Sequence, residues 1–284
     1  MKKKTKQFLE YLALFLFYKI SRILGLKISS MIGGLLLFFY GKFSSKNKIA
    51  LDNLSKAFPN KTIIEKRNII NKMWFHFGRV LGEYPHLDKI KVLNNNDIKI
   101  EGLGNLLNPL KKNKNCLFFS AHLGNWELTS HPLTQSGYNI SFIYRAPNNT
   151  LVDNLLSKIR GSYGVGLIKK GPSGAKKCIS ILQKKNGNIG MLIDQKMNDG
   201  IETKFFGCKT MTASAIAKFS LKFKCPIIPA VCKRVNGNKF IIKYFPPISY
   251  KKISSLKTEL KVMNLLNKYV EEWIKENPEQ WIWV

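Results

Sequence analysis

His122 and Glu127 are the residues whose types and spacing best suit acid–base chemistry in this chain. An apolar run over 115–120 predicts a buried strand that ends just before the histidine. A histidine at the rim of a sheet can accept a proton near neutral pH, and a neighbouring carboxylate would fix its tautomer and stabilise the imidazolium. The alternative is a structural histidine followed by an acid in the first turn of a helix. Because strand, His, Gly and Glu coincide, we predict a general base, His122, oriented by Glu127.

Gly124 and Asn125 lie at the predicted start of a helix over 124–135. The first N–H groups of a helix have no partner within it and favour negative charge nearby. We therefore expect the backbone N–H groups of these two residues to stabilise an oxyanion that forms beside the histidine.

Arg145 and Asp194 each follow a predicted strand, and the carboxyl ends of parallel strands gather catalytic loops at one edge of a sheet. We expect Arg145 to bind a phosphate, because its planar guanidinium donates paired hydrogen bonds; a surface ion pair is the alternative. Asp194 is expected to order Arg145 or a lysine, or to bind an acceptor sugar. Capping of the next turn would also explain it.

A second basic group, Arg160 with Lys169-Lys170, is expected to face phosphate, although the two lysines could be ordinary solvated side chains. Phe205-Phe206-Gly207 and the residues from Thr210 predict an apolar loop that enters a helix. Its aromatic side chains would suit an acyl chain, and core packing would explain them equally well.

The residues around the histidine form a longer motif, Ser120-Ala121-His122-Leu123-Gly124-Asn125-Trp126-Glu127. It resembles the H-x4-[D/E] motif of the glycerolipid acyltransferase superfamily. The residues within the motif are similar to those of the branch that adds secondary acyl chains to lipid A. The likeness continues in the family's order at Tyr144-Arg145-Ala146-Pro147, Asp194-Gln195, Phe205-Phe206-Gly207 and Pro278-Glu279-Gln280-Trp281-Ile282-Trp283.

This resemblance implies an O-acyltransferase that uses an acyl carrier protein thioester as donor and a lipid A precursor, a Kdo-lipid IVA-like glycolipid, as acceptor. The acceptor hydroxyl would attack the thioester directly, with no metal and no bound organic cofactor. Gln195 and Phe206 would join Arg145, Arg160, Lys169 and Asp194 in binding substrate. The expected location is the cytoplasmic face of the inner membrane of a Gram-negative bacterium. A lysophospholipid or glycerolipid acyltransferase with the same dyad is the nearest alternative.

Composition narrows the function classes. The 284 residues are 45% hydrophobic, which is enough for one large α/β domain, and the formal net charge is +30. Such a charge suits an acidic carrier protein or an anionic membrane. A nucleic-acid-binding protein is disfavoured because the aromatic residues sit in apolar runs rather than among basic ones. A non-catalytic membrane-surface protein is disfavoured because it would give His122 and Glu127 no function. The five cysteines form no C-x-x-C pair and suit a reducing compartment.

Residues 1–42 form a separate segment with two apolar stretches, 8–17 and 28–40, between basic residues. Neither stretch reaches the roughly 20 apolar residues of a spanning helix. We therefore predict a helical pair at the membrane surface, with lysines adding about 1 kcal/mol each against an anionic leaflet. A single span, or a helix packed on the body, is the alternative. Residues 43–284 would form the acyltransferase domain.

Apolar strands alternate with helices from residue 90 to 245, which predicts an α/β fold: a mixed, largely parallel sheet flanked by helices. The predicted strands are 97–100, 115–120, 139–144, 188–193, 226–232 and 239–244. The predicted helices are 124–135, 150–161, 173–185, 211–222 and 256–276, preceded by a helix that Thr62 and Glu65 begin with a capping box.

Overall fold

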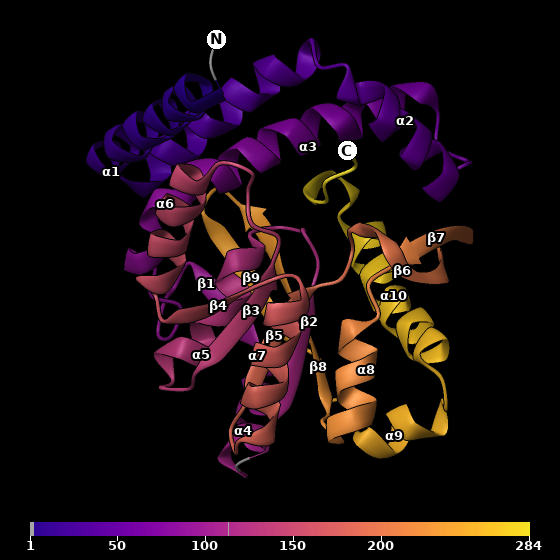
Figure 1. Cartoon of the computed structure of the whole chain (residues 1–284). Helices are drawn as coiled ribbons and strands as arrows, with labels where there is room; N and C mark the ends of the chain where they lie inside the picture. The colour runs from indigo at the N-terminus through magenta and orange to yellow at the C-terminus, as the bar shows by residue number, and fades with distance from the viewer. Residues whose placement is uncertain (1–2, 113) are drawn as a thin grey trace.

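A seven-stranded sheet forms the centre of the computed structural model, which describes residues 3–112 and 114–284 (Figure 1). The strand order is β1-β9-β8-β2-β5-β3-β4, and every neighbouring pair is parallel except β8 and β9. The predicted mixed, largely parallel sheet is therefore confirmed. Its strands are β1 (Ile98–Glu101), β2 (Cys116–Ser120), β3 (Ile140–Tyr144), β4 (Val165–Lys169), β5 (Asn188–Leu192), β8 (Ile227–Asn236) and β9 (Lys239–Tyr244).

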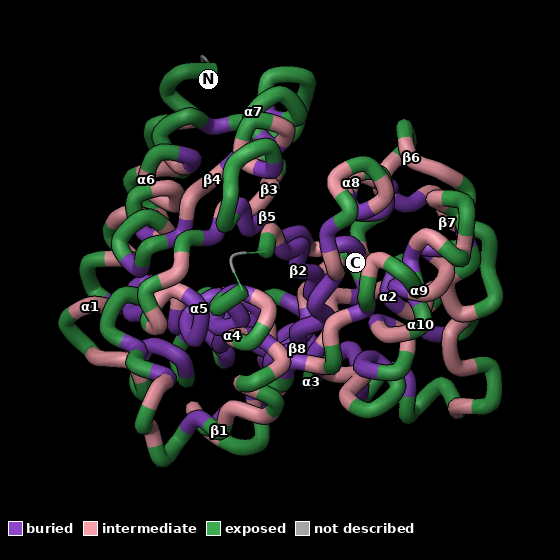
Figure 2. Tube along the Cα trace, turned by 90° about the horizontal axis from the view of Figure 1, so that it is seen from below, coloured by how far each residue is buried: buried purple, intermediate pink, exposed green. Residues whose placement is uncertain are grey.

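The two faces of the sheet carry separate hydrophobic cores. Strand β2 is buried along its whole length and alternates between them: Leu117 and Phe119 belong to one core, and Cys116 and Phe118 to the other. Figure 2 shows the buried residues concentrated along these central strands. A strand covered on both faces reads as one continuous apolar run, which is why the sequence predicts β2 so directly.

The helices are bounded as follows: α1 Lys3–Lys42, α2 Lys46–Ala57, α3 Ile63–Glu83, α4 Leu103–Lys111, α5 His131–Gln135, α6 Thr150–Gly161, α7 Pro172–Gln183, α8 Ala215–Phe223, α9 Tyr250–Ser255 and α10 Glu259–Glu276. Three 3-10 helices are η1 Tyr84–Lys89, η2 Trp126–Ser130 and η3 Pro278–Gln280. The predicted capping box is confirmed, because Thr62 and Glu65 exchange hydrogen bonds at the start of α3.

Three predicted helices begin later than expected, and one of them, predicted over 256–276, begins at Glu259 as α10. The segment 124–135 contains η2 and then α5, because Asn125 has a non-helical backbone (φ −100°, ψ 83°) and Pro132 begins a new turn. The helix expected from residue 211 begins at Ala215, because the preceding residues form an antiparallel hairpin, β6 (Lys196–Phe205) with β7 (Cys208–Thr212). Thr210, expected in a loop that enters the helix, is thus a residue of strand β7.

The N-terminal helix α1 consists of two helical halves joined at Gly25, whose φ of 78° interrupts it. Residues 1–2 of the predicted N-terminal segment lie outside the described residues. The second half packs on α3 at backbone contact: a Cβ on Gly33 would lie 2.3 Å from the oxygen of Gly78, and one on Gly78 would lie 2.1 Å from the oxygen of Gly33. Close approach of this kind requires glycine on both helices.

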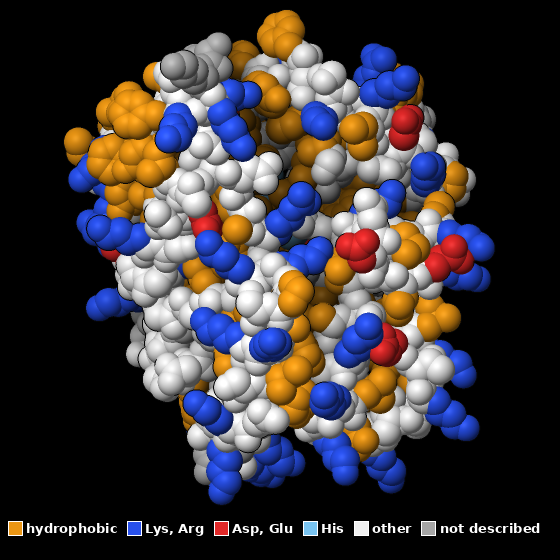
Figure 3. Space-filling model, viewed as in Figure 1, with side chains coloured by type: hydrophobic (Ala, Val, Ile, Leu, Met, Phe, Trp, Pro, Cys, Tyr) orange, Lys and Arg blue, Asp and Glu red, His pale blue; other side chains and the backbone are white. Residues whose placement is uncertain are grey.

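Helix α1 also exposes large apolar side chains, among them Phe8, Leu16, Ile23, Ile28 and Phe39. Hydrophobic side chains gather in Figure 3 at the upper left, where Figure 1 shows α1. An exposed apolar patch of this extent marks a surface that meets a membrane or a partner. By length and composition alone, α1 could also cross a membrane.

Candidate active site

His122 lies just beyond the carboxyl end of β2 and is held there by Asp194. Its backbone N–H donates to Oδ2 of Asp194 at 2.8 Å, and its ring Nδ1 lies 2.9 Å from Oδ1. Asp194 follows β5, the neighbour of β2, so both residues emerge at the same sheet edge. The indole Nε1 of Trp281 donates to the same carboxylate at 2.7 Å. The second ring nitrogen of His122, Nε2, is left to act as a base.

The environment of His122 favours its protonated form. Burial is the largest single influence and lowers the pKa, but the charge and the hydrogen bond of Asp194 together raise the pKa above its ordinary value. The pKa of Asp194 is correspondingly lowered, because His122 and its other donors outweigh the effect of its burial. The pair therefore behaves as an imidazole with its own buried counter-charge.

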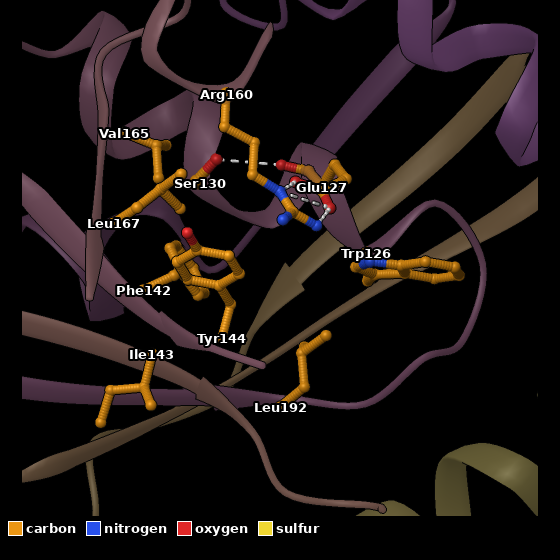
Figure 4. Close-up of a pocket in the computed structure, with 10 residues that line it drawn as sticks. All are labelled: Trp126, Glu127, Ser130, Phe142, Ile143, Tyr144, Arg160, Val165, Leu167 and Leu192. Carbon is orange, nitrogen blue, oxygen red and sulfur yellow. Dashed lines mark hydrogen bonds and ion pairs between the residues drawn. The ribbon is translucent and has the colours of Figure 1, made fainter. Parts of the chain in front are cut away.

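Glu127 does not make the predicted contact with His122. It instead accepts hydrogen bonds from Arg160 Nη2 at 2.7 Å, from the hydroxyl of Tyr163 at 2.6 Å and from the hydroxyl of Tyr84. The ion pair with Arg160 is visible in Figure 4. Burial acts to raise the pKa of Glu127, but Arg160 and the hydroxyl donors lower it to about 2. The 3-10 turn of η2 points this carboxylate toward α6, so Glu127 acts on His122 through its charge, which raises the pKa of the histidine.

The predicted oxyanion site is also altered. The N–H of Gly124 donates to the backbone oxygen of Gln280 at 3.1 Å, so it is not free. Asn125 is fully buried, and its side chain donates to Glu83 rather than facing a cavity. The helix start expected at residue 124 is displaced, because the 3-10 helix η2 begins at Trp126 with Asn125 as its N-cap.

An apolar cavity of about 590 Å³ opens on one side of His122. Its walls come from α1, α3 and α6, with Trp126 beside the histidine. The lining side chains include Leu14, Phe17, Leu36, Leu37, Phe77, Leu81, Leu155 and Ile159. A cavity with this lining suits a hydrocarbon chain.

A polar cavity of about 790 Å³ opens on the other side. His122, Gln195, Ile282 and Val284 line both cavities, so the histidine sits where they meet. The cations of the polar cavity are Arg145, Lys56, Lys196 and Lys209, and its aromatic side chains are Phe205, Phe206, Trp281 and Trp283. Figure 3 shows a hollow beneath α3 on this face of the molecule, with Lys and Arg side chains around it.

Arg145 and Phe206 are placed in the polar cavity, Arg145 as an exposed part of its wall. Within residues 3–112 and 114–284, Arg145 makes no ion pair. Phe206 packs against Phe58 and Trp283, so it does not line the apolar cavity.

The second basic group expected from the sequence does not face a cavity as free cations. Arg160 is committed to Glu127, and Lys169 pairs at 2.7 Å with Asp153, which also accepts from the hydroxyl of Tyr144 at 3.0 Å. Expectations of phosphate binding by Arg160 and Lys169 therefore do not match their contacts. Asp194 likewise orders His122 rather than Arg145 or a lysine.

A base between an apolar cavity and a cationic one can promote the transfer of an acyl group to a polar acceptor by taking the proton of the acceptor. Metal chemistry has no evident site in the described part of the chain, where no three His, Cys, Asp or Glu side chains gather around one point. Burial raises the pKa of Cys116 and of Cys232 to about 12, so neither of these two thiols is an activated nucleophile.

Comparison with known proteins agrees with this chemistry. The family model described as bacterial lipid A biosynthesis acyltransferase matches residues 2–284, which include the sheet and both cavities. No curated protein matches the chain.

Proposed function

The chain belongs to the bacterial lipid A biosynthesis acyltransferase family, so it is an enzyme that transfers acyl groups in lipid A synthesis, and we propose that its donor is an acyl carrier protein thioester and its acceptor a hydroxyl of a lipid A precursor. The observation that carries this proposal is the place of His122, which lines both the apolar and the polar cavity.

The apolar cavity is proposed to hold the acyl chain. Burial of a hydrocarbon chain gives about 0.8 kcal/mol for each methylene group, which favours a long-chain donor. Its walls include Leu14, Phe17 and Leu36 of α1, so the N-terminal helix contributes to the site itself.

The polar cavity is proposed to hold the phosphorylated sugar of the acceptor. Arg145, Lys56 and Lys196 supply positive charge without an acidic partner among the described residues, and a guanidinium can bind phosphate through two parallel hydrogen bonds. A bound sugar would also contact Gln195, which lies beside the base.

In the proposed reaction Nε2 of His122 takes the proton of the acceptor hydroxyl as its oxygen attacks the thioester carbonyl carbon. Asp194 stabilises the imidazolium that forms. Collapse of the tetrahedral intermediate breaks the carbon–sulfur bond, and the departing thiolate takes the proton from His122. Products are an ester and a free carrier thiol, so atoms and charge balance. A base in this role contributes about 10²–10⁴-fold to the rate.

Association with the cytoplasmic face of the inner membrane is the proposed location. The exposed apolar side of α1 is suited to the lipid interface, and the overall positive charge is suited to an anionic leaflet and an acidic carrier protein.

The test is transfer of radiolabelled acyl groups from acyl carrier protein to a lipid A precursor in detergent micelles by the purified full chain. We expect labelled product with this acceptor, and none when His122→Ala replaces the wild type. Labelling of lysophospholipid alone would overturn the glycolipid assignment. Equal use of acyl coenzyme A would overturn the preference for the carrier protein.

A further inference from the structure

A second ionic cluster adjoins the segment that carries the base, apart from the His122–Asp194 pair. Its centre is Glu83, the last residue of α3, whose side chain is fully buried. Arg234 of β8 binds both of its oxygens, Nη1 to Oε1 at 2.7 Å and Nη2 to Oε2 at 2.9 Å. Ser30 of α1 donates to Oε1 at 2.7 Å. Three elements distant in sequence therefore meet at one carboxylate.

The cluster reaches the catalytic segment through Asn125, three positions after His122. Asn125 Nδ2 donates to Oε2 of Glu83 at 2.8 Å, while Oδ1 has no hydrogen-bond partner among the described residues. Because a carboxylate only accepts hydrogen bonds, Glu83 dictates which way this amide faces. Burial of this side chain therefore satisfies its donor, Nδ2, and leaves its acceptor, Oδ1, without a hydrogen bond from the described residues.

The neighbouring residue is fixed against the same strand that carries Arg234. Gly124 has a φ of +61°, and a Cβ there would lie 1.7 Å from the oxygen of Cys232, so only glycine fits. The backbone oxygen of Gln280 accepts from the Gly124 N–H, and the Gln280 side chain exchanges two hydrogen bonds of 2.8 Å with the backbone of Arg234.

We propose that Glu83 and Arg234 are positioning residues for the reaction proposed above: through Asn125 they hold the segment after β2 so that Nε2 of His122 faces both cavities. This inference rests on the proposed function. Stability alone is a weak reason for such a cluster, since an apolar pair of similar volume often stabilises a core as well as or better than a buried ion pair. Hydrogen bonds are directional, by contrast, so the bond to the fixed carboxylate of Glu83 allows a single position of Asn125.

A matched pair of variants separates positioning from stability. Asn238 also donates to Glu83, from Nδ2 to Oε1 at 3.0 Å, but it lies in the turn between β8 and β9. Asn125→Ala and Asn238→Ala each remove one amide donor from the same carboxylate. We expect Asn125→Ala to lower kcat by roughly 10- to 100-fold with little change in KM, as a small misplacement of a reacting group does. Asn238→Ala should keep the wild-type kcat.

The pH profile of kcat/KM should keep its acid limb in Asn125→Ala, since Asp194 still pairs with the base. Hydrogen exchange gives a readout that does not depend on activity. Amides of residues 120–127 should exchange faster in Asn125→Ala and unchanged in Asn238→Ala. If the wild type shows no acyl transfer, the proposed function fails, and hydrogen exchange alone decides whether the cluster fixes the segment.

A double variant guards against loss of folding. Replacing the ion pair by Glu83→Met with Arg234→Met removes both charges of the pair together, and Arg79, the remaining cation of the cluster, keeps Ser30 and Asn238 as hydrogen-bond acceptors, so the chain should fold. We expect normal thermal unfolding and the same loss of kcat as in Asn125→Ala. The proposal is overturned if this double variant keeps a kcat within about twofold of the wild type, or if both asparagine variants lose activity in proportion to their loss of stability.

Discussion

Asp194 Oδ1 lies 2.9 Å from Nδ1 of His122, across the ends of two paired parallel strands. The same carboxylate accepts the backbone N–H of the histidine, so it fixes both the ring and the chain from which the ring projects. Glu127 adds its charge to the environment of His122, but the hydrogen bonds that orient the base come from Asp194. The two carboxylates near the site consequently have separate tasks, and their variants should fail in different ways.

Asp194→Asn should remove the counter-charge while nearly preserving the shape of the side chain. We expect kcat to fall on the order of 10²-fold or more, because the imidazolium that forms on His122 loses its stabilising partner. Initial rates of acyl transfer measure this, and a thermal melt serves as the control for folding. Near-normal rates in a folded Asp194→Asn protein would contradict the proposed pairing.

The pH dependence of kcat/KM should reveal the same pair. His122 must be neutral to accept a proton, so the rate should rise with pH through its pKa. Asp194 raises that pKa, so the acid limb of the wild type should lie above the ordinary histidine value of about 6.5. In Asp194→Asn the limb should move to lower pH. A limb that stayed in place would show that another group sets it.

Glu127→Gln should act mainly on stability. The substitution leaves Arg160 without a counter-charge in a site where its side chain is only 20% exposed, and loss of one partner of a buried pair costs about 3–5 kcal/mol. The folded pKa of Glu127 is about 2, below its unfolded value of about 4.5, so its stabilisation is present above pH 4.5 and is lost as pH falls toward 2. Denaturant titration of both proteins between pH 3 and pH 7 would measure this.

The difference in stability between the two proteins should be largest at pH 7 and should narrow toward pH 3, as the wild type loses the stabilisation that its carboxylate provides. In the fraction that remains folded, Glu127→Gln should keep the acid limb of the wild-type pH profile. A shift of that limb like the one in Asp194→Asn would restore Glu127 to the orienting role that its spacing suggests.

Arg145→Lys should retain charge and lose the planar donor pair. We expect KM for the phosphorylated acceptor to rise about tenfold, the equivalent of about 1.4 kcal/mol, with KM for the acyl donor unchanged. Arg67→Lys is the matched control, since Arg67 is exposed on α3 and lines neither cavity. Unchanged kinetics in both variants would place Arg145 outside the acceptor site.

The fold was predictable because its signals are local. Strand β2 is a continuous apolar run, and the capping box of α3 lies within four residues. Strand β4 and the hairpin β6–β7 were not predicted, because glycine and polar side chains interrupt their apolar patterns. Strand β4 contains Gly166, and β6 is mostly polar.

The sequence predicted which residues belong to the site better than it predicted which of them contact one another. The rule that strand ends meet at one edge brought His122, Arg145 and Asp194 together, and they do line one cavity. Which carboxylate reaches the histidine depends on how the chain turns after β2, and a helix was assumed there. The buried partnership of Glu83 with Arg234 joins residues 151 positions apart, and neither residue carries a local signal of it.

The role of α1 in the apolar cavity leads to a prediction about donor choice. Leu14 lines that cavity, whereas Leu9, five positions earlier on the same helix, is 48% exposed and does not. Leu14→Trp should fill part of the cavity and disfavour long acyl chains, because burial is worth about 0.8 kcal/mol for each methylene group that no longer fits. Leu9→Trp adds the same bulk to the exposed side.

Competition between two acyl carrier protein donors of different chain length, with products resolved by mass spectrometry, measures the effect within one reaction. Leu14→Trp should shift the product ratio toward the shorter chain by roughly fourfold for each methylene excluded, and Leu9→Trp should leave the ratio unchanged. Both variants should sediment with membranes as the wild type does, since each substitution keeps an apolar side chain on α1. An unaltered ratio in Leu14→Trp would mean that the acyl chain lies elsewhere and that α1 serves only as an anchor.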